Sequence, residues 1–353
     1  MNINWIFEFF LLLILCSIKR VDKQGEEASV YTRPVSNSIK GVAAILIVLH
    51  HIAWKLEEAN IIVWFYREIN LFAVGVFLFF SGFGLLKSYE ARGGTERKGV
   101  IKYASRLLLS YFTVFMFKLL IDLCSIKIDY SIIKSVLTLQ MPPSQLWYLK
   151  AQLVCYLLFV ISGCFFKKDY HKMVIFVLAP ILLWTLVSLA LGREYINMAW
   201  YNTLPCFPIG MMAAAEEGKI TGLVKKRPVM AVLSLTGTVL LLSAPFLFIA
   251  KDMIYLFLAV YSVLFYAIFL HFWAVQSVVW DFIGQYSLSI YLIHLLLLDI
   301  FQRCQLDVTK GVTVCFLLIG TLAFSVILDA LVGKMTRIVT ENAERAFGKN
   351  KVG

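Results

Sequence analysis

Long apolar runs alternate along this chain with short polar segments that are mostly basic. Windows almost free of charge recur about ten times, each close to the roughly 20 residues that cross about 30 Å of hydrocarbon. We place these windows at 38–56, 69–87, 105–124, 146–166, 173–192, 198–216, 228–250, 253–273, 281–300 and 311–333. The pattern predicts an all-α fold, a polytopic transmembrane helix bundle of about ten spans.

An apolar stretch at residues 5–18 precedes these windows. It is 14 residues long and contains Glu8, so it is short for a span, and it lacks the basic start and cleavage site of a signal peptide. We expect a short N-terminal helix at the membrane interface, with an eleventh span as the alternative. The expected organisation is an N-terminal segment and polar cytoplasmic linker at 1–37, a membrane domain at 38–333 and a cytoplasmic basic tail at 334–353.

Composition supports a membrane location and argues against nucleic acid as a partner. The chain is 60% hydrophobic and 16% charged, and its mean hydropathy is +0.81, whereas a soluble domain is nearer half apolar and a quarter charged. The net charge of +11 comes from short clusters between apolar runs, most of them on one side of the expected bundle. The positive-inside rule then predicts a multi-pass protein of the plasma (inner) membrane with both termini in the cytoplasm. Anionic lipids and anionic cofactors remain as partners for these clusters.

Metal chemistry and the soluble hydrolase classes find no support in the sequence. The seven cysteines form no C-x-x-C pair and lie mostly in apolar runs, so we interpret them as small buried or lipid-facing side chains and expect no metal. There is no G-x-S-x-G elbow, no P-loop and no H-E-x-x-H.

Ionisable residues inside the expected spans carry most of the functional information, because a charged or titratable group in hydrocarbon is costly unless it pairs or lines a cavity. The main ones are His50, His51, Arg106, Lys118, Asp122, Lys150, Glu216, His271, His294 and Asp299.

Two of these histidines fall at comparable depth. His51 lies about 16 Å beyond Lys40, and His294 about 20 Å beyond Asp281, if each helix is straight. Two imidazoles at one depth can form a reaction centre or a proton path; two unrelated core histidines are the alternative. His50 and His51 point about 100° apart on a helix, so only one of them faces a given site.

The segment 87–106 carries six basic residues, including Lys102 and Arg106. It is either ordinary positive-inside topology or a surface that binds phosphate or pyrophosphate. Residues 79–84 contain Ser81, Gly82 and Gly84 in an apolar setting, which close packing of helices explains without chemistry.

Four stretches in this order resemble acyltransferase family 3, the polytopic membrane O-acyltransferases. They are S38-IKGVAAILIVLH-H51 with a basic residue eleven positions before the histidine, F77-LFFSG-F83 followed by the basic segment and Arg106, L146-WY-L149, and G284-QYSLSIYLI-H294. The resemblance covers roughly residues 36–333. The family often has Arg where this chain has Lys40, a change that keeps the charge and loses bidentate geometry.

The resemblance implies transfer of an acyl group, most often acetyl from acetyl-CoA or another acyl-CoA, to a hydroxyl of a sugar, a lipid-linked sugar or another cell-envelope acceptor. We expect a stand-alone member without a periplasmic hydrolase-like domain. In such a member we expect His51 to act as general base, with His294 and Tyr291 beside it. The cations expected at the coenzyme A phosphates are Lys40, Lys102 and Arg106. We expect Trp147 and Tyr148 at the substrate. The choice between His50 and His51 stays open.

A transporter or exporter of envelope glycans, with the histidines as a proton relay, is the main alternative function. A structural or assembly subunit without chemistry is the second. The sequence shows no paired repeat halves with matching interrupted helices, which many transporters contain.

Overall fold

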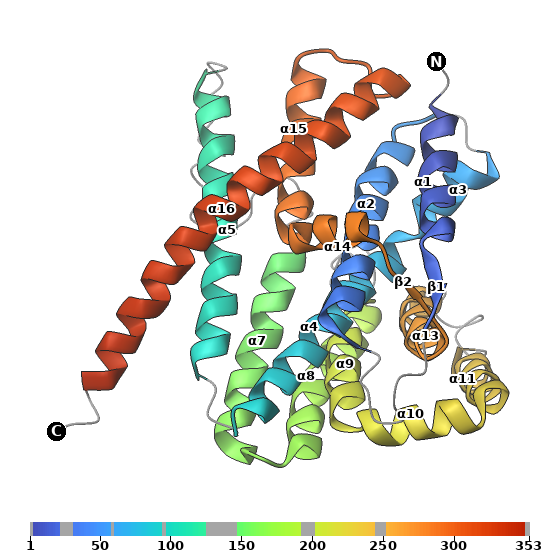
Figure 1. The fold of residues 1–353 in the computed structure, drawn as a ribbon, viewed down its shortest axis with the longest axis vertical. Coiled ribbons are helices and arrows are strands. Elements are labelled where there is room, and N and C mark those ends of the chain that lie inside the picture. Colours follow the sequence, from blue (N-terminus) through green and yellow to red (C-terminus); the bar gives the residue numbers. More distant parts are fainter. Residues whose placement is uncertain are drawn as a thin grey trace.

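The computed structural model describes residues 3–21, 31–57, 60–93, 97–124, 147–191, 202–243 and 252–349. This part of the chain is a bundle of α-helices with one pair of very short strands (Figure 1), which confirms the predicted all-α class. The elements are α1 Asn4–Cys16, β1 Ile18–Arg20, α2 Arg33–Ala53, α3 Ile61–Glu68, α4 Asn70–Ala91, α5 Arg97–Cys124, α7 Trp147–Phe166, α8 Tyr170–Leu191, α9 Cys206–Ala215, α10 Glu217–Lys226, α11 Pro228–Ser243, α13 Asp252–Phe269, β2 Trp273–Val275, α14 Val278–Gln285, α15 Ser287–Arg303 and α16 Gly311–Lys349.

Helix α2 is the central element of the bundle. It begins at Arg33 with Pro34 in its first turn, where a proline ring costs no hydrogen bond, so it takes in residues that we assigned to the linker. Nearly every side chain from Val35 to Ala53 is buried, and α3, α4, α14 and α15 all pack against it. At 21 residues it is about 30 Å long, enough to cross a bilayer.

Glycines allow two pairs of helices to touch through their backbones. A Cβ at Gly41 of α2 would overlap the carbonyl of Trp280, and one at Gly284 of α14 would overlap the carbonyl of Asn37. Gly82 of α4 meets α9 in the same way. The structure thus confirms that the small residues at 79–84 serve close helix contact, through Gly82, whereas Gly84 faces open space.

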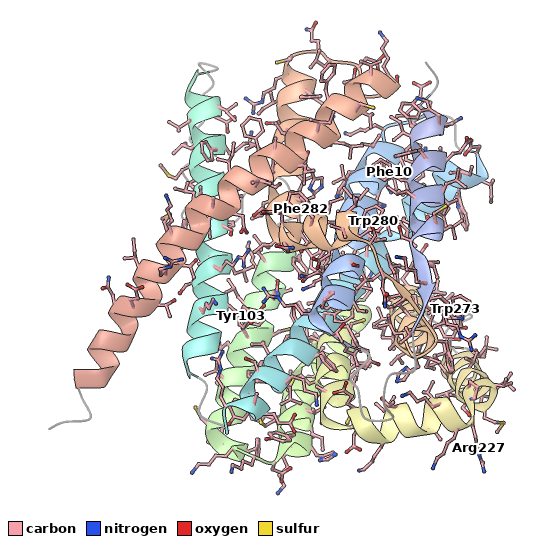
Figure 2. The ribbon with its side chains drawn as sticks, viewed as in Figure 1. Phe10, Tyr103, Arg227, Trp273, Trp280 and Phe282 are labelled. Atoms are coloured by element: carbon pink, nitrogen blue, oxygen red, sulfur yellow. The ribbon has the colours of Figure 1, made fainter. Side chains whose placement is uncertain are left out.

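The predicted straight span 281–300 is wrong. The chain forms α14 and α15 with a bend of 72° between them. In Figure 1, α14 lies across the bundle at mid-height and α15 runs upward from it; Trp280 and Phe282, labelled in Figure 2, mark α14. The close contact of Gly41 and Gly284 with opposing backbones holds α14 across α2, and a straight helix would lose that contact.

The predicted count of ten spans is not confirmed. Six helices in the described residues are long and apolar enough to cross a membrane, or seven if α14 and α15 form one broken span. Shorter apolar helices, α9, α11 and α13, occupy the windows 198–216, 228–250 and 253–273. Residues 192–201 and 244–251, which complete those windows, lie outside the described residues, as do parts of the basic segment (94–96), the linker (22–30) and the tail (350–353).

The outer surface of the bundle is apolar, as a lipid environment requires. Large hydrophobic side chains project outward from several helices, among them Leu157 and Phe165 of α7, Leu183 of α8, Leu241 of α11, and Phe316 and Ile319 of α16. These residues have no role in the core, and their exposure to water would be unfavourable. The protein is therefore a polytopic helical membrane protein.

The N-terminal helix α1 has 13 residues, too few to span the bilayer. It packs beside α3, where the hydroxyl of Tyr66 donates to the carbonyl of Phe7 over 2.9 Å. The strand β1 that follows pairs antiparallel with β2, Ile18 opposite Val275. This two-stranded sheet, which the apolar pattern did not predict, ties the N-terminal segment to the membrane domain.

Candidate active site

His51 and His294 lie side by side inside the bundle. His51 is in the last turn of α2, and His294 is seven residues into α15. Their ring centroids are 5.3 Å apart and the rings are stacked at 28°. The depth expected for His294 assumed a straight helix from Asp281; although the bend changes that path, the two imidazoles meet.

The backbone fixes which nitrogen of His294 carries the proton. Nδ1 lies 2.9 Å from the carbonyl oxygen of Ile290, and because a carbonyl only accepts, Nδ1 must donate. The other nitrogen, Nε2, is then a lone-pair acceptor in the neutral ring. His294 is 1% exposed, and within the described structure its Nε2 is buried with no hydrogen-bond partner. A buried nitrogen in this state is available to accept a hydrogen bond from a bound molecule.

His50 faces a different neighbour. Its Nδ1 lies 3.2 Å from the carbonyl oxygen of Tyr66 at the end of α3, so it ties two elements together. The rings of His50 and His51 are edge-on to one another, as adjacent positions on a helix require. Of the two, His51 is the one stacked on His294, which favours it as the reactive histidine.

Aromatic rings continue the site from His294 toward α7. Tyr291, one turn before His294, has its ring centroid 6.0 Å from that imidazole and 5.3 Å from the ring of Tyr148. Trp147 stands edge-on to Tyr148. The structure thus joins His51, His294, Tyr291 and Tyr148 into one continuous wall, with Trp147 at its edge.

A polar cluster beside this wall was missed by sequence reasoning. Gln152 of α7 donates through Nε2 to the hydroxyl of Ser81 at 2.9 Å and to that of Tyr156 at 2.7 Å. Its Oε1 is buried without a partner in the described residues. The available signal was a glutamine within an apolar span, where a polar side chain needs a partner.

The three cations expected to bind the cofactor differ in their surroundings. Arg106 of α5 forms an ion pair with Asp329 of α16, the partner that its position in a span requires. Lys40 of α2 is partly buried, and the charged groups that act on it include Arg106 and Asp281. Lys102, one turn before Arg106, is exposed. Lys40 and Arg106 therefore belong to one charged region, and Lys102 lies at its surface.

The charged region and the histidine pair lie at different heights along α2. Lys40 precedes His51 by eleven residues, which is a rise of about 16 Å in a helix. Asp281 is held by the side-chain amides of Asn37 at 3.0 Å and Gln285 at 3.3 Å.

In the part of the chain that the structure describes, His, Cys, Asp and Glu side chains form no cluster of three that would hold a metal ion.

These features define a polytopic helical membrane protein with a buried histidine pair, an aromatic wall and a cationic region below them. The family model of acyltransferase family 3, described as an acyltransferase domain, matches residues 36–330. The chain belongs to this family and is a membrane acyltransferase. The matched residues include both histidines, the aromatic wall, Lys40, Arg106 and Asp329. No curated protein and no solved structure matches the chain.

Proposed function

We propose that the protein transfers an acyl group, acetyl in the first place, from acyl-CoA to a hydroxyl of a sugar or lipid-linked sugar of the cell envelope. The observation that carries the proposal is the stacked pair of His51 and His294, with the Nε2 lone pair of His294 buried and unpartnered. Such a pair supplies one general base and one hydrogen-bond acceptor at a single place. This is what transfer from a thioester to a hydroxyl requires.

In the proposed reaction His51 is the general base. It removes the proton of the acceptor hydroxyl as the oxygen attacks the thioester carbonyl, a C–O bond forms, the C–S bond breaks, and the coenzyme A thiolate takes the proton back from the imidazolium. Nε2 of His294 accepts a hydrogen bond from a second hydroxyl of the sugar acceptor and orients it. Tyr291 supports His294 and relays protons, while Trp147 and Tyr148 offer apolar faces to the acyl and sugar groups.

Positively charged side chains position the acyl-CoA donor in this proposal. Lys40 and Arg106 are the proposed partners of the coenzyme A phosphates, with Lys102 at the entrance. We place this side of the bundle in the cytoplasm of a plasma-membrane protein, together with the C-terminus, because the basic segments gather there. The acyl arm then extends along α2 toward His51.

Labelled acetyl-CoA tests the donor. We expect purified protein in nanodiscs to bind it and to pass the label to an envelope fraction from the producing cells. A transporter would move protons or glycan without consuming acetyl-CoA, and an assembly subunit would do neither. Absence of both binding and turnover would contradict the proposal.

The pair of Arg106 and Asp329 tests the phosphate site. Arg106→Ala and Asp329→Ala both break the ion pair, but only the first removes the cation. One charge-assisted hydrogen bond is worth about 1.5–3 kcal/mol, so we expect Arg106→Ala to raise KM for acetyl-CoA by about tenfold or more and Asp329→Ala to leave it nearly unchanged. Equal effects of the two variants on KM would show that Arg106 has a structural role and does not bind phosphate.

A further inference from the structure

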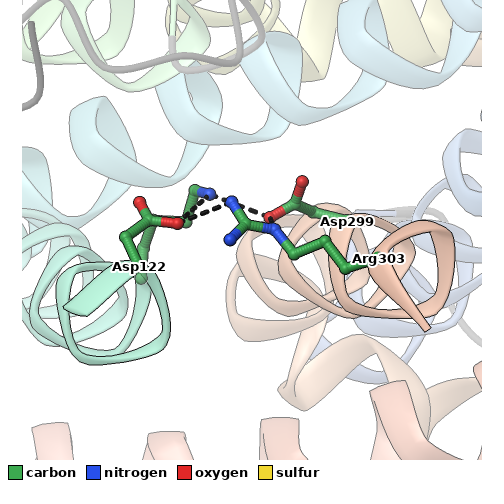
Figure 3. A network of polar contacts seen from close by, with 4 residues as sticks. Asp122, Asp299 and Arg303 are labelled. Carbon is green, nitrogen blue, oxygen red and sulfur yellow. Dashed lines mark hydrogen bonds and ion pairs between the residues drawn. The ribbon is translucent and has the colours of Figure 1, made fainter. Parts of the chain in front are cut away.

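Four charged residues form a closed ladder between α5 and α15 (Figure 3). Lys118 and Asp122 are one turn apart on α5, and Asp299 and Arg303 are one turn apart on α15. Nζ of Lys118 lies 3.0 Å from Asp122 and 2.8 Å from Asp299. The guanidinium of Arg303 lies 2.5 Å from Asp122 and 3.0 Å from Asp299. Each acid therefore contacts both cations.

The ladder defines how far α15 lies along α5. Position 118 pairs with 299 and position 122 with 303, the same separation in sequence both times, so the two helices run parallel in one register. A slip of one turn, about 5.4 Å, would place Asp299 beside Asp122 in one direction, or Arg303 beside Lys118 in the other. Either slip replaces attraction between opposite charges with repulsion between like charges. Asp122 and Lys118 of the ladder are largely covered, whereas about a third of each side chain of Asp299 and Arg303 is exposed. Ionic groups at matched positions on two helices set the register of their packing.

The register of α15 decides where His294 lies. The bend of 72° after α14 means that the tight packing of α14 on α2 does not by itself set the position of α15. His294 is five residues before Asp299, and its ring is 5.3 Å from that of His51. A slip of one turn is as long as this separation and would take the two rings apart.

We propose that Lys118, Asp122, Asp299 and Arg303 are positioning residues that set the register of α15 and so hold His294 against His51. The consequence for activity rests on the proposed function, in which His51 takes the proton of the attacking hydroxyl and His294 orients the acceptor molecule. The register itself does not depend on that function.

Exchanging the charges of one helix at a time tests the ladder. Lys118→Asp/Asp122→Lys keeps the pair within α5 but turns both contacts with α15 into like-charge contacts. Asp299→Arg/Arg303→Asp does the same from α15. The variant with all four changes restores every attraction. All four proteins have the same composition and net charge, so each is a control for the others.

We expect either half exchange to lower kcat about a hundredfold, since misplacing a reacting group by an ångström or more costs this much, while KM for acetyl-CoA stays within about twofold. The fourfold exchange should recover kcat to within about a factor of three. Wild-type kcat in the half exchanges, or no recovery in a folded fourfold variant, would overturn the proposal.

A structural readout separates this inference from the proposed function. The test introduces His51→Cys and His294→Cys into a chain whose seven native cysteines are replaced by alanine. The measurement is the yield of cross-linking between these two cysteines by a short thiol cross-linker. Cross-linking should fall in the half exchanges and return in the fourfold exchange, even if the wild-type protein proves to have no acyltransferase activity. Unchanged cross-linking in the half exchanges would overturn the register claim. Should a half exchange fail to fold, Asp299→Asn, which removes only one charge, is expected to lower cross-linking, and an unchanged yield would count against the claim.

Discussion

At the scale of single residues, the proposed chemistry depends on the direction in which each imidazole nitrogen faces. The carbonyl of Ile290 holds Nδ1 of His294 as a donor and leaves Nε2 as the acceptor. The carbonyl of Tyr66 engages Nδ1 of His50, which ties that ring to α3. His50 and His51 thus differ in their neighbours, since His50 contacts a backbone oxygen of α3 and His51 stacks on His294.

His294→Phe tests whether Nε2 matters apart from packing. The phenyl ring can still stack on His51, but it has no nitrogen to accept a hydrogen bond from the second hydroxyl of the acceptor. We expect kcat to fall about a hundredfold, the lower end of what a positioned proton-transfer partner contributes, with acetyl-CoA binding unchanged. Near-wild-type kcat in this variant would mean that His294 acts through ring packing alone.

At the scale of elements, two helix contacts position the histidine pair: that of α14 with α2 and that of α15 with α5. Gly41 and Gly284 let α14 cross α2 at backbone distance, and the bend at the start of α15 then turns the histidine helix upward along α2. The charge ladder with α5 completes the placement. Loss of either contact is expected to disturb the histidine pair without touching it.

Gly41→Ala measures the first of these contacts, and Gly84→Ala is its matched control. The added methyl at position 41 overlaps the backbone of Trp280, whereas at position 84 it meets nothing within 4 Å. Overpacking of this kind costs about 1–3 kcal/mol, so we expect a lower thermal midpoint and lower activity for Gly41→Ala only. Equal midpoints for the two variants would show that α14 can move away from α2 at little cost.

At the scale of the whole molecule, the sequence predicted the class of fold, and it named the histidines and tyrosines that the structure brings together. Apolar windows were sufficient for helices such as α2, α4, α7 and α16, because lipid and core both demand long apolar helices. The two histidines were found because a titratable group in such a window is unusual. The family resemblance added the expectation that Tyr291 and Tyr148 lie at the site.

What the sequence did not predict depends on contacts between distant segments. The break between α14 and α15 follows from packing on α2, and its window was as apolar as that of a straight helix. Asp329 pairs with Arg106, Asp299 with Lys118 and Arg303 with Asp122, each across a sequence separation of 181 to 223 residues, where no local pattern pairs them. Gln152 was missed for the same reason, since its partner Ser81 is on another helix.

Acyl transfer from labelled acetyl-CoA by His51→Ala, with His50→Ala as the matched control, tests the central claim most directly. Both variants lose one imidazole from the same turn of α2, and only His51 is stacked on His294. We predict that His51→Ala loses about 10²–10⁴-fold in kcat while expression, membrane insertion and acetyl-CoA binding are retained, and that His50→Ala loses stability but keeps kcat near wild type. Wild-type transfer by His51→Ala, or the reverse ranking of the two variants, would contradict the account.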